Sequence, residues 1–469
     1  MPRPAHRVGA PRLRMLLALL CAALLALTAA CARGEVRNTS PDSIKVWIVE
    51  DLPDRVAATQ RIVDDFSSRS GVTVQLVAVA EDQFNQLLLS SAAAGDLPDV
   101  VGGVPLGQVR TMSSNELIDP EATAAVLNAL DPTTFTPSAL ELTREGDRQL
   151  AIPSEAWTQM LVYRRDLFEA AGLAPPTTYA AILAAAQALN SPDRAGFIGS
   201  TVAGDSFTEQ TFEYLAAANG CQLVDDSGEI TFNSPQCVEA LQFYGSLVRD
   251  YSLPGAQDVD TTRATYFAGQ AAMTIWSTFL LDEMAGLRDD AKPSCPECED
   301  DPAFLATNSG IVTAVAGPQG SPTVFGEVTS WVVTAAASTA PASAFVEHML
   351  NDGYLPWIAI APEGKVPMRT GTPGDARRYS TEWASLPVGV DTKAPLSKFY
   401  DQSVITALTT GPTRLSRWAI PQGQGNLLGA LQGEQPVAEA VNEVSNGTDP
   451  GQAAEQAAEA IASIQESQQ

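Results

Sequence analysis

Histidine is the catalytic residue type that this chain has least of. It contains two, His6 near the start and His348 in the amphipathic segment "ASAFVEHMLND". A Ser-His-Asp triad in the folded part would have to use His348, and a histidine-rich catalytic zinc site is excluded. No GxSxG nucleophile motif is present, and "EGKV" lacks the first glycine and the Ser or Thr of a phosphate-binding loop. Glycoside hydrolysis by a carboxylate pair stays open, because it needs only two suitably spaced acids and the chain has 55.

The seven tryptophans indicate a different chemistry. Four lie in or beside the ends of apolar runs, in "SEAWTQ", "MTIWST", "VTSWVV" and "YLPWIA". A flat indole packs on the C–H face of a sugar ring, while carboxylates and amides bind its hydroxyl edge. These four tryptophans are therefore candidate ligand-binding residues. Trp47 and Trp383 are expected in the core.

Four cysteines follow the N-terminal segment, an even number that suits disulfides in an exported protein: Cys221, Cys237, Cys295 and Cys298. We favour pairing Cys221 with Cys237 and Cys295 with Cys298, because each pair is local, while four cysteines allow three pairings. A four-thiolate zinc site on the "CPEC" turn is an alternative whose spacing the chain only half supplies. We therefore expect disulfides and neither a metal nor a cofactor.

The first 30 residues have the layout of an export signal. Four arginines precede the uncharged run "MLLALLCAALLALTAA", which is shorter than the roughly 20 apolar residues of a membrane-spanning helix. Cys31 follows the small residues that close this run, and the stretch resembles the lipobox of bacterial lipoproteins. The resemblance implies a lipoprotein signal peptide at residues 1–30, a lipid anchor on Cys31 and a tether at residues 31–42. A secretory signal with an incidental cysteine is the alternative.

The rest of the chain is acidic and long enough for more than one domain. The signal region holds four of the 28 basic residues and none of the 55 acidic ones, which leaves 24 against 55, a net charge of −31. Such a surface repels nucleic acid and anionic lipid headgroups. With 469 residues, 45% of them apolar, the chain can bury a large core, and we expect two lobes.

Strand and helix signals alternate after the tether. The strand-like runs "IKVWIV", "VTVQLVAV" and "PDVVGGV" are separated by the helical runs "PDRVAATQRIVDDFSSRSG" and "EDQFNQLLLSSAAAG". This β-α-β-α-β order predicts a parallel sheet covered by helices, with ligands beyond the carboxyl ends of the strands. The middle of the chain is mostly helical, strands return at "GIVTAVAGP" and "EVTSWVVTAAAS", and Asp449 is expected to cap a last helix.

The order of these segments resembles the extracellular solute-binding proteins of bacterial ATP-driven importers, in the carbohydrate-binding group that includes maltose-binding protein. The likeness is carried by "AAAGDLPDVV", "IPSEAWTQMLVYRRDLFEAAGLAPPTTY", "SGEITFNSPQCVEALQFYGSLV", "YFAGQAAMTIW" and "GKVPMRTG", in that order. It implies an α/β, two-lobed periplasmic-binding-protein-like fold of type II, with mixed, largely parallel sheets flanked by helices and a ligand cleft between the lobes. The implied lobes are residues 43–152 with 306–353 and residues 153–305 with 366–469, joined by a crossing segment at 354–365.

The resemblance also assigns ligand contacts, mainly to loops that follow strands. The implied contact residues are Glu50, Asp51, Glu81, Gly103, Trp157, Thr158, Trp276, Ser330, Trp331 and Arg369. The turn after "PDVV" departs from the family, because it reads "GGVPLGQ" where relatives often carry an acidic residue.

The implied function is capture of a sugar or sugar-like solute at the extracytoplasmic face and its delivery to an ABC permease. The implied protein is a monomer held to the membrane through Cys31. Since binding needs no nucleophile or base, the poverty of catalytic residues fits a protein without enzyme activity. A lipid-anchored glycoside hydrolase is the alternative.

Overall fold

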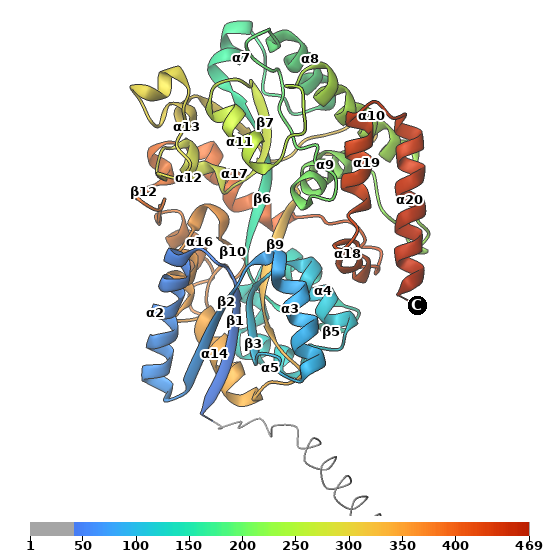
Figure 1. Ribbon diagram of the computed structural model, residues 1–469. Coiled ribbons are helices and arrows are strands. Elements are labelled where there is room, and N and C mark those ends of the chain that lie inside the picture. Colours follow the sequence, from blue (N-terminus) through green and yellow to red (C-terminus); the bar gives the residue numbers. More distant parts are fainter. Residues whose placement is uncertain (1–41, 469) are drawn as a thin grey trace, which may run out of the picture.

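The computed structural model of the protein describes residues 42–468 and has two lobes, one above the other in Figure 1. Lobe 1 opens with the expected β-α-β-α-β unit: β1 (Ser43–Val49), α2 (Pro53–Ser70), β2 (Thr73–Val79), α3 (Glu81–Ala94) and β3 (Val100–Val104). β1 pairs in parallel with both β2 and β3. The chain enters β1 at the far end of lobe 1, so the carboxyl ends of these three strands point toward lobe 2 (Figure 1).

Local sequence explains where the first helix starts and stops. Pro53 occupies its first turn, where a missing N–H costs nothing. Gly71 ends the helix with a left-handed φ of 76°, which glycine adopts without strain. Ile62, Val63 and Phe66 bury one side of α2, as their helical spacing predicts.

A single long strand belongs to both lobes. The first half of β6 (Ile152–Arg164) pairs with β9 (Gly326–Val333), which also pairs with β3. The second half of β6 pairs with β7 (Met273–Ser277) and β8 (Ser309–Val312) in lobe 2. All these pairings are antiparallel, so the sheet is mixed and its parallel part is confined to β1, β2 and β3. β6 runs through the waist of the molecule (Figure 1).

Helices surround this sheet. Those of lobe 1 are α2, α3, α4 (Leu106–Ser114), α5 (Pro120–Leu130), α6 (Pro137–Leu142), α14 (Thr339–Leu350), α15 (Tyr354–Ile358) and α16 (Arg378–Trp383). Those of lobe 2 are α7 (Arg165–Ala171), α8 (Tyr179–Leu189), α9 (Ser206–Ala218), α10 (Pro235–Asp250), α11 (Val259–Phe267), α12 (Leu280–Met284), α13 (Phe304–Asn308), α17 (Gln402–Thr410), α19 (Pro436–Ser445) and α20 (Pro450–Ser467). The short helix α18 (Asn426–Leu431) bridges the lobes, because it packs on α4 of lobe 1 and on α20 of lobe 2. The Asp449 side chain caps α20 as expected, accepting hydrogen bonds from two N–H groups of its first turn.

The lobe boundaries differ from those expected. Residues 306–325 lie with lobe 2, because β8 pairs with the second half of β6, and the chain returns to lobe 1 only at β9. Residues 366–383 lie with lobe 1, because β10 (Val366–Pro367) pairs with the first half of β6 and α16 packs on α15. The crossing is therefore not at 354–365, where α15 packs on α2 and α14. The chain passes to lobe 2 after α16, at the hairpin of β11 (Pro387–Val388) and β12 (Ala394–Pro395), whose loop hydrogen-bonds Leu287.

Two disulfides lie within lobe 2, Cys221–Cys237 and Cys295–Cys298, which are the two local pairs. Trp47 and Trp383 are both buried, the latter with its indole N–H donated to the Pro362 carbonyl at 2.8 Å. Across residues 42–468, no helix combines the length and the apolar character needed to cross a bilayer. The same span contains no group of three or more His, Cys, Asp or Glu side chains placed to hold a metal ion.

Candidate functional site

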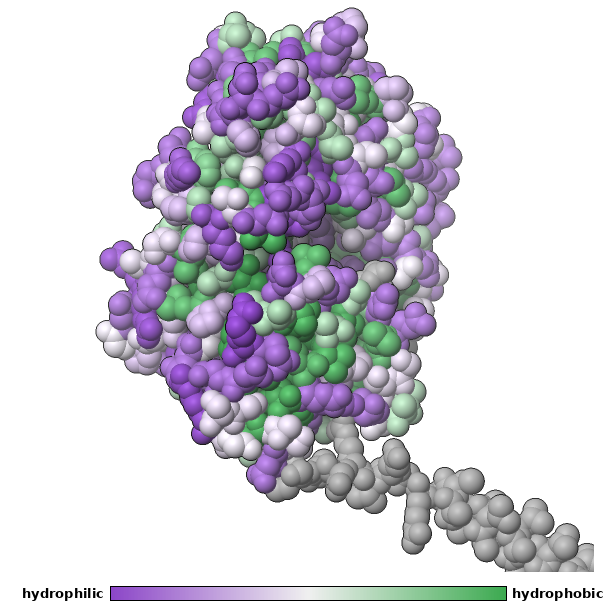
Figure 2. All heavy atoms as spheres, turned by 60° about the vertical axis from the view of Figure 1, so that its left-hand side comes forward, coloured by the Kyte–Doolittle hydropathy of each residue, from purple (hydrophilic) through white to green (hydrophobic). Residues whose placement is uncertain are grey.

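A cavity of about 460 Å³ lies between the lobes, where the loops after β1, β2 and β3 face lobe 2. The space-filling view shows the surface indented at this waist (Figure 2). Lobe 1 lines the cavity with Glu50, Asp51, Glu81, Gly103 and their neighbours. Lobe 2 lines it with the first turns of α9, the end of β7, and α12 with the residue that precedes it. The residues are Ser206, Phe207, Gln210, Trp276, Ser277, Phe279 and Glu283.

The floor of the cavity is a small grid of side chains on one face of the sheet. Residues 155, 157 and 159 alternate along β6 and therefore point the same way. Each stands opposite another cavity-lining residue across the antiparallel ladders: Glu155 opposite Thr329, Trp157 opposite Glu327, and Gln159 opposite Ser277. Directly opposed side chains on one face lie within contact distance. The floor thus runs along β6 from lobe 1 into lobe 2.

Aromatic rings form the lobe 2 side. The rings of Phe207 and Trp276 lie 4.7 Å apart, centroid to centroid, tilted by 57°. Phe279 follows Trp276 around the same turn, and the Arg55 guanidinium of lobe 1 lies 5.5 Å from its ring centre. With Trp157 on the floor, the cavity presents flat apolar surfaces from two directions. Such surfaces suit the C–H faces of a sugar or polyol.

Every basic residue that lines the cavity is paired with an acid. Arg55 lies 3.2 Å from Glu50, measured from guanidinium nitrogen to carboxylate oxygen, and Lys365 lies 2.8 Å from Glu155. The third, Arg288, lies 3.6 Å from Glu283. Six acidic residues line the cavity against these three basic ones. An anionic ligand would therefore meet net negative charge and no uncommitted cation among the lining residues.

The acids of the floor are held by protein groups. Glu155 accepts a hydrogen bond from the Trp357 indole N–H at 2.8 Å in addition to its ion pair. Glu327 accepts the Leu106 backbone N–H at 2.9 Å and forms an ion pair with Arg417. Each carboxylate is thereby fixed in place by two protein partners.

Burial changes the protonation of the acid at the lobe 2 wall. Glu283 is almost fully buried, and this burial raises its pKa to about 7, with the neighbouring carboxylate of Asp282 acting in the same direction. Arg263 and Arg288 oppose the rise. One oxygen of Glu283, Oε2, has no hydrogen-bond partner in the described chain.

Gln159 is one of the cavity residues that sequence reasoning missed. Its side chain is fully buried, and neither Nε2 nor Oε1 has a hydrogen-bond partner within the described chain. Buried amides are nearly always paired, so an unpaired one at a cavity wall indicates a place for a ligand or water. The available signal was its position two residues after Trp157 in a strand, since alternate residues share a face.

The structure brings six of the ten expected contact residues to the cavity: Glu50, Asp51, Glu81, Gly103, Trp157 and Trp276. The other four are absent from the lining. Thr158 and Ser330 are fully buried and alternate with the lining residues of β6 and β9, so they point to the opposite face of the sheet. Cys31 lies outside the described residues.

Trp331 lies in the core of lobe 1. Its indole is fully buried against Phe345 and Trp357, with ring centroids 5.8 and 5.2 Å away. The ring occupies the space beside Gly102, where a Cβ would come within 2.2 Å of it. Gly102 is thus required by the tryptophan, while Gly103 is required by its own φ of 71°. Together they account for the "GG" turn.

Arg369 holds together the ends of two helices. Its guanidinium donates to the Leu130 carbonyl at 2.9 Å, at the end of α5, and to the Leu350 carbonyl at the end of α14. It also donates to Thr134 Oγ1 at 3.1 Å and to Asn351 Oδ1 at 2.6 Å. A buried cation is favourable there, because helix C-termini present unpaired carbonyls.

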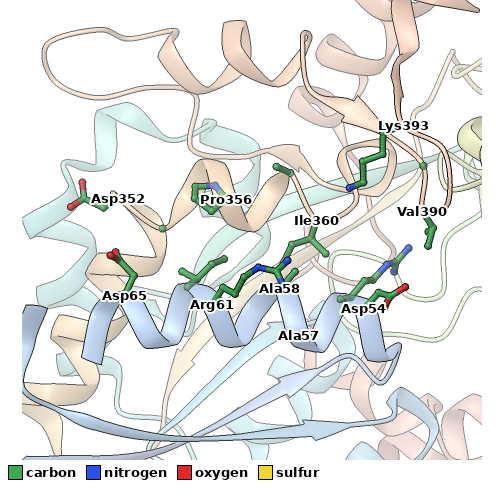
Figure 3. Close-up of a pocket in the computed structure, with 15 residues that line it drawn as sticks. Asp54, Ala57, Ala58, Arg61, Asp65, Asp352, Pro356, Ile360, Val390 and Lys393 are labelled. Carbon is green, nitrogen blue, oxygen red and sulfur yellow. The ribbon is translucent and has the colours of Figure 1, made fainter. Parts of the chain in front are cut away.

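A larger hollow, of about 590 Å³, lies outside the cavity (Figure 3). Ala57 and Ala58 on α2 face Pro356 on α15 and Ile360 in the turn after it, with Lys393 at its edge. None of the ten expected contact residues and no aromatic residue lines it. The cavity between the lobes, and not this hollow, is therefore the candidate functional site.

Comparisons with known proteins agree with this geometry. The profile of the bacterial extracellular solute-binding protein family matches residues 50–356. The chain is 27% identical over 351 residues to the putative ABC transporter periplasmic-binding protein YcjN of Escherichia coli K12, covering 73% of this chain and 76% of that protein.

Solved structures share the fold at low sequence identity. A sugar transporter from Arthrobacter chlorophenolicus A6 with bound laminaribiose matches with a TM-score of 0.67 and 20% identity, over 90% of this chain and 99% of that one. Maltose-bound MalE3 of T. maritima matches with a TM-score of 0.68 and 15% identity, over the same shares of the two chains. The fold is the two-lobed type II periplasmic-binding-protein fold. Because the family profile matches more than half of this chain, the chain belongs to the bacterial extracellular solute-binding proteins.

Proposed function

We propose that this chain captures an uncharged sugar or sugar alcohol outside the cytoplasmic membrane and delivers it to the permease of an ABC importer. The observation that carries the proposal is the cavity floor and wall, where Trp157, Trp276 and Phe207 offer flat apolar faces beside the unpaired amide of Gln159. Hydroxyl groups supply both donors and acceptors to such an amide. Laminaribiose and maltose, bound by the two structural neighbours, have this chemistry.

The charge of the cavity narrows the ligand class. Arg55, Lys365 and Arg288 are each committed to a carboxylate, and the lining acids outnumber them. Phosphorylated sugars and sugar acids would have to displace one of these ion pairs. Neutral ligands need no such displacement.

The family is one of binding proteins, and the chain is not an enzyme. The hydrolase alternative needs one carboxyl free to donate a proton and another free to attack or activate water. On the floor, Glu155 and Glu327 are each engaged by two protein groups, which suits holding a shape rather than exchanging protons.

Thermal unfolding tests the proposal. The chain lacking its first 31 residues is heated with maltose, laminaribiose, ribitol, glucose 6-phosphate and galacturonate. A ligand at 1,000 times its dissociation constant stabilises the folded state by about 4 kcal/mol, enough for a clear rise in the unfolding temperature. We expect a rise with one or more neutral compounds and none with the two anions. A rise confined to the anions would contradict the neutral-ligand proposal.

We also propose that the mature chain is a monomer anchored through a lipid on Cys31. The support is the placement of this cysteine directly after the apolar run and its closing small residues. Several acyl chains would hold the protein firmly, since each buried methylene contributes about 0.8 kcal/mol. Cys31→Ser should move the protein from the membrane fraction to the soluble extracytoplasmic fraction. Unchanged membrane association would contradict the anchor.

A further inference from the structure

The amide of Gln159 has an unusual position in the cavity. The side chain is 0% exposed, yet its polar atoms have no partner in the described chain, while its backbone N–H is bonded to the Phe325 carbonyl at 2.9 Å. The strand is therefore held firmly and the side chain is not engaged. Ser277 stands directly opposite on β7, and Trp157 precedes it on the same face.

Among the other polar side chains of the floor, the two carboxylates already have partners, whereas the Thr329 hydroxyl, like the Gln159 amide, has none in the described chain. Glu155 and Glu327 are held as described above, so their oxygens cannot turn to a ligand without breaking an ion pair. Gln159 can donate through Nε2 and accept through Oε1 at no such cost. An unpaired buried amide destabilises the empty protein, and a ligand that pairs with it recovers that loss.

We propose that Gln159 is a specificity-determining residue of the cavity, reading two adjacent hydroxyls of the ligand, one as acceptor and one as donor. This inference rests on the proposed function. The expected ligands are therefore sugars and polyols that carry two neighbouring free hydroxyl groups. These two hydroxyls must lie in the part of the bound ligand that contacts Gln159, at the lobe 2 end of the floor. A ligand lacking either hydroxyl leaves half of the amide unpaired.

Calorimetric titration of the full chain with maltose, laminaribiose, ribitol and tagatose tests the inference. Gln159→Leu removes both polar atoms, and Gln159→Glu keeps the size but removes the donor. We expect both to weaken binding of the ligands that the native chain accepts, the leucine variant by about tenfold or more. Thr274→Val is the matched control, because Thr274 is a buried β7 residue whose hydroxyl is also unpaired but which does not line the cavity. Its affinity should stay within about twofold of the native value.

Monodeoxy derivatives of the accepted ligand give a readout that a structural role would not move. Removal of a hydroxyl read by Gln159 should weaken binding to the native chain and leave binding to Gln159→Leu unchanged. If every derivative loses the same affinity for both proteins, the inference is overturned. Equal losses would mean that the removed hydroxyl and Gln159 act independently, because only groups in contact have non-additive effects.

The unliganded variants separate this inference from the proposed function. The unfolding temperature of empty Gln159→Leu should equal or exceed that of the native chain, because an unpaired buried amide is removed. A lower temperature would assign Gln159 to the fold and overturn the inference. If the native chain binds sugars and Gln159→Leu binds them equally well, the inference fails and the function stands. If the native chain binds none of the four compounds, the proposed function fails, and the inference falls with it.

Discussion

Trp276 and Trp331 both lie beside the ends of apolar runs in the sequence, but their surroundings in the fold differ. Replacing the first should therefore affect ligand affinity, and replacing the second should affect stability. Trp276 lines the cavity beside Phe207, while Trp331 is enclosed by lobe 1. We expect Trp276→Ala to abolish most ligand-induced stabilisation. Trp331→Ala should lower the free energy of unfolding by about 3–5 kcal/mol through the cavity it leaves, and the remaining folded protein should bind ligand normally. Chemical denaturation and calorimetry on both variants check this; loss of affinity in folded Trp331→Ala would contradict it.

Cavity residues could be predicted from the sequence where they come directly after a strand. Glu50 and Asp51 follow β1 and Glu81 follows β2, and all three line the cavity. Within β6 and β9 the face of the strand decides instead. The same alternation that brings Gln159 to the cavity turns Thr158 away from it. Arg369 could not have been placed, because its partners are carbonyls at the ends of α5 and α14, far away in sequence.

At the scale of elements, α12 packs on the short turn at 362–364, and this contact brings the buried acids Asp282 and Glu363 close together. Burial, with Asp282 adding to it, raises the pKa of Glu363 to about 8, while Arg55 opposes the rise. Burial raises the pKa of Asp282 to about 6, with Arg288 and Arg55 opposing. The folded state therefore keeps protons that the unfolded chain has lost above about pH 5.

Raised folded-state pKa values make stability fall as pH rises. The contribution of these acids is fully present below their ordinary pKa and is lost as pH passes through about 6 to 8. We expect the unfolding temperature to decline between about pH 5 and pH 8, and Glu363→Gln to flatten the decline. Gln in place of exposed Glu229 is the control, with the native slope expected. A native slope in Glu363→Gln would contradict the assignment.

The elements themselves were predictable where local signals are strong. The β-α-β-α-β unit has prolines, glycines and regular periodicity, and it forms as expected. The lobe boundaries were not predictable, because β8 and β10 are only four and two residues long. Each belongs to a lobe only through the half of β6 with which it pairs. Nothing local in so short a strand encodes that choice.

At the scale of the whole molecule, a buried ion-pair network ties the lobes together at the floor of the cavity. Glu327 accepts the N–H of Leu106 from lobe 1 and pairs with Arg417, which also lies 3.4 Å from Glu213 on α9. Arg417→Met leaves two buried carboxylates uncompensated and should lower the free energy of unfolding by about 3–5 kcal/mol. Arg148→Met, which removes an exposed ion pair with Glu145, should cost less than about 1 kcal/mol. Equal losses in denaturant titrations would contradict this difference.

The unbroken course of β6 through the waist has a consequence for the time course of binding. Two-lobed binding folds close by a hinge motion. Because β6 is shared by both lobes, we expect them to turn about an axis close to this strand, so that Trp157 and Gln159 move little. A solute can therefore bind to these two side chains at first encounter, before the lobe 2 residues of the cavity close on it. Encounter rates should then depend on floor residues, whereas residence times should depend on Trp276 and Phe207. Stopped-flow traces of indole fluorescence would accordingly show two phases, with only the first depending on solute concentration.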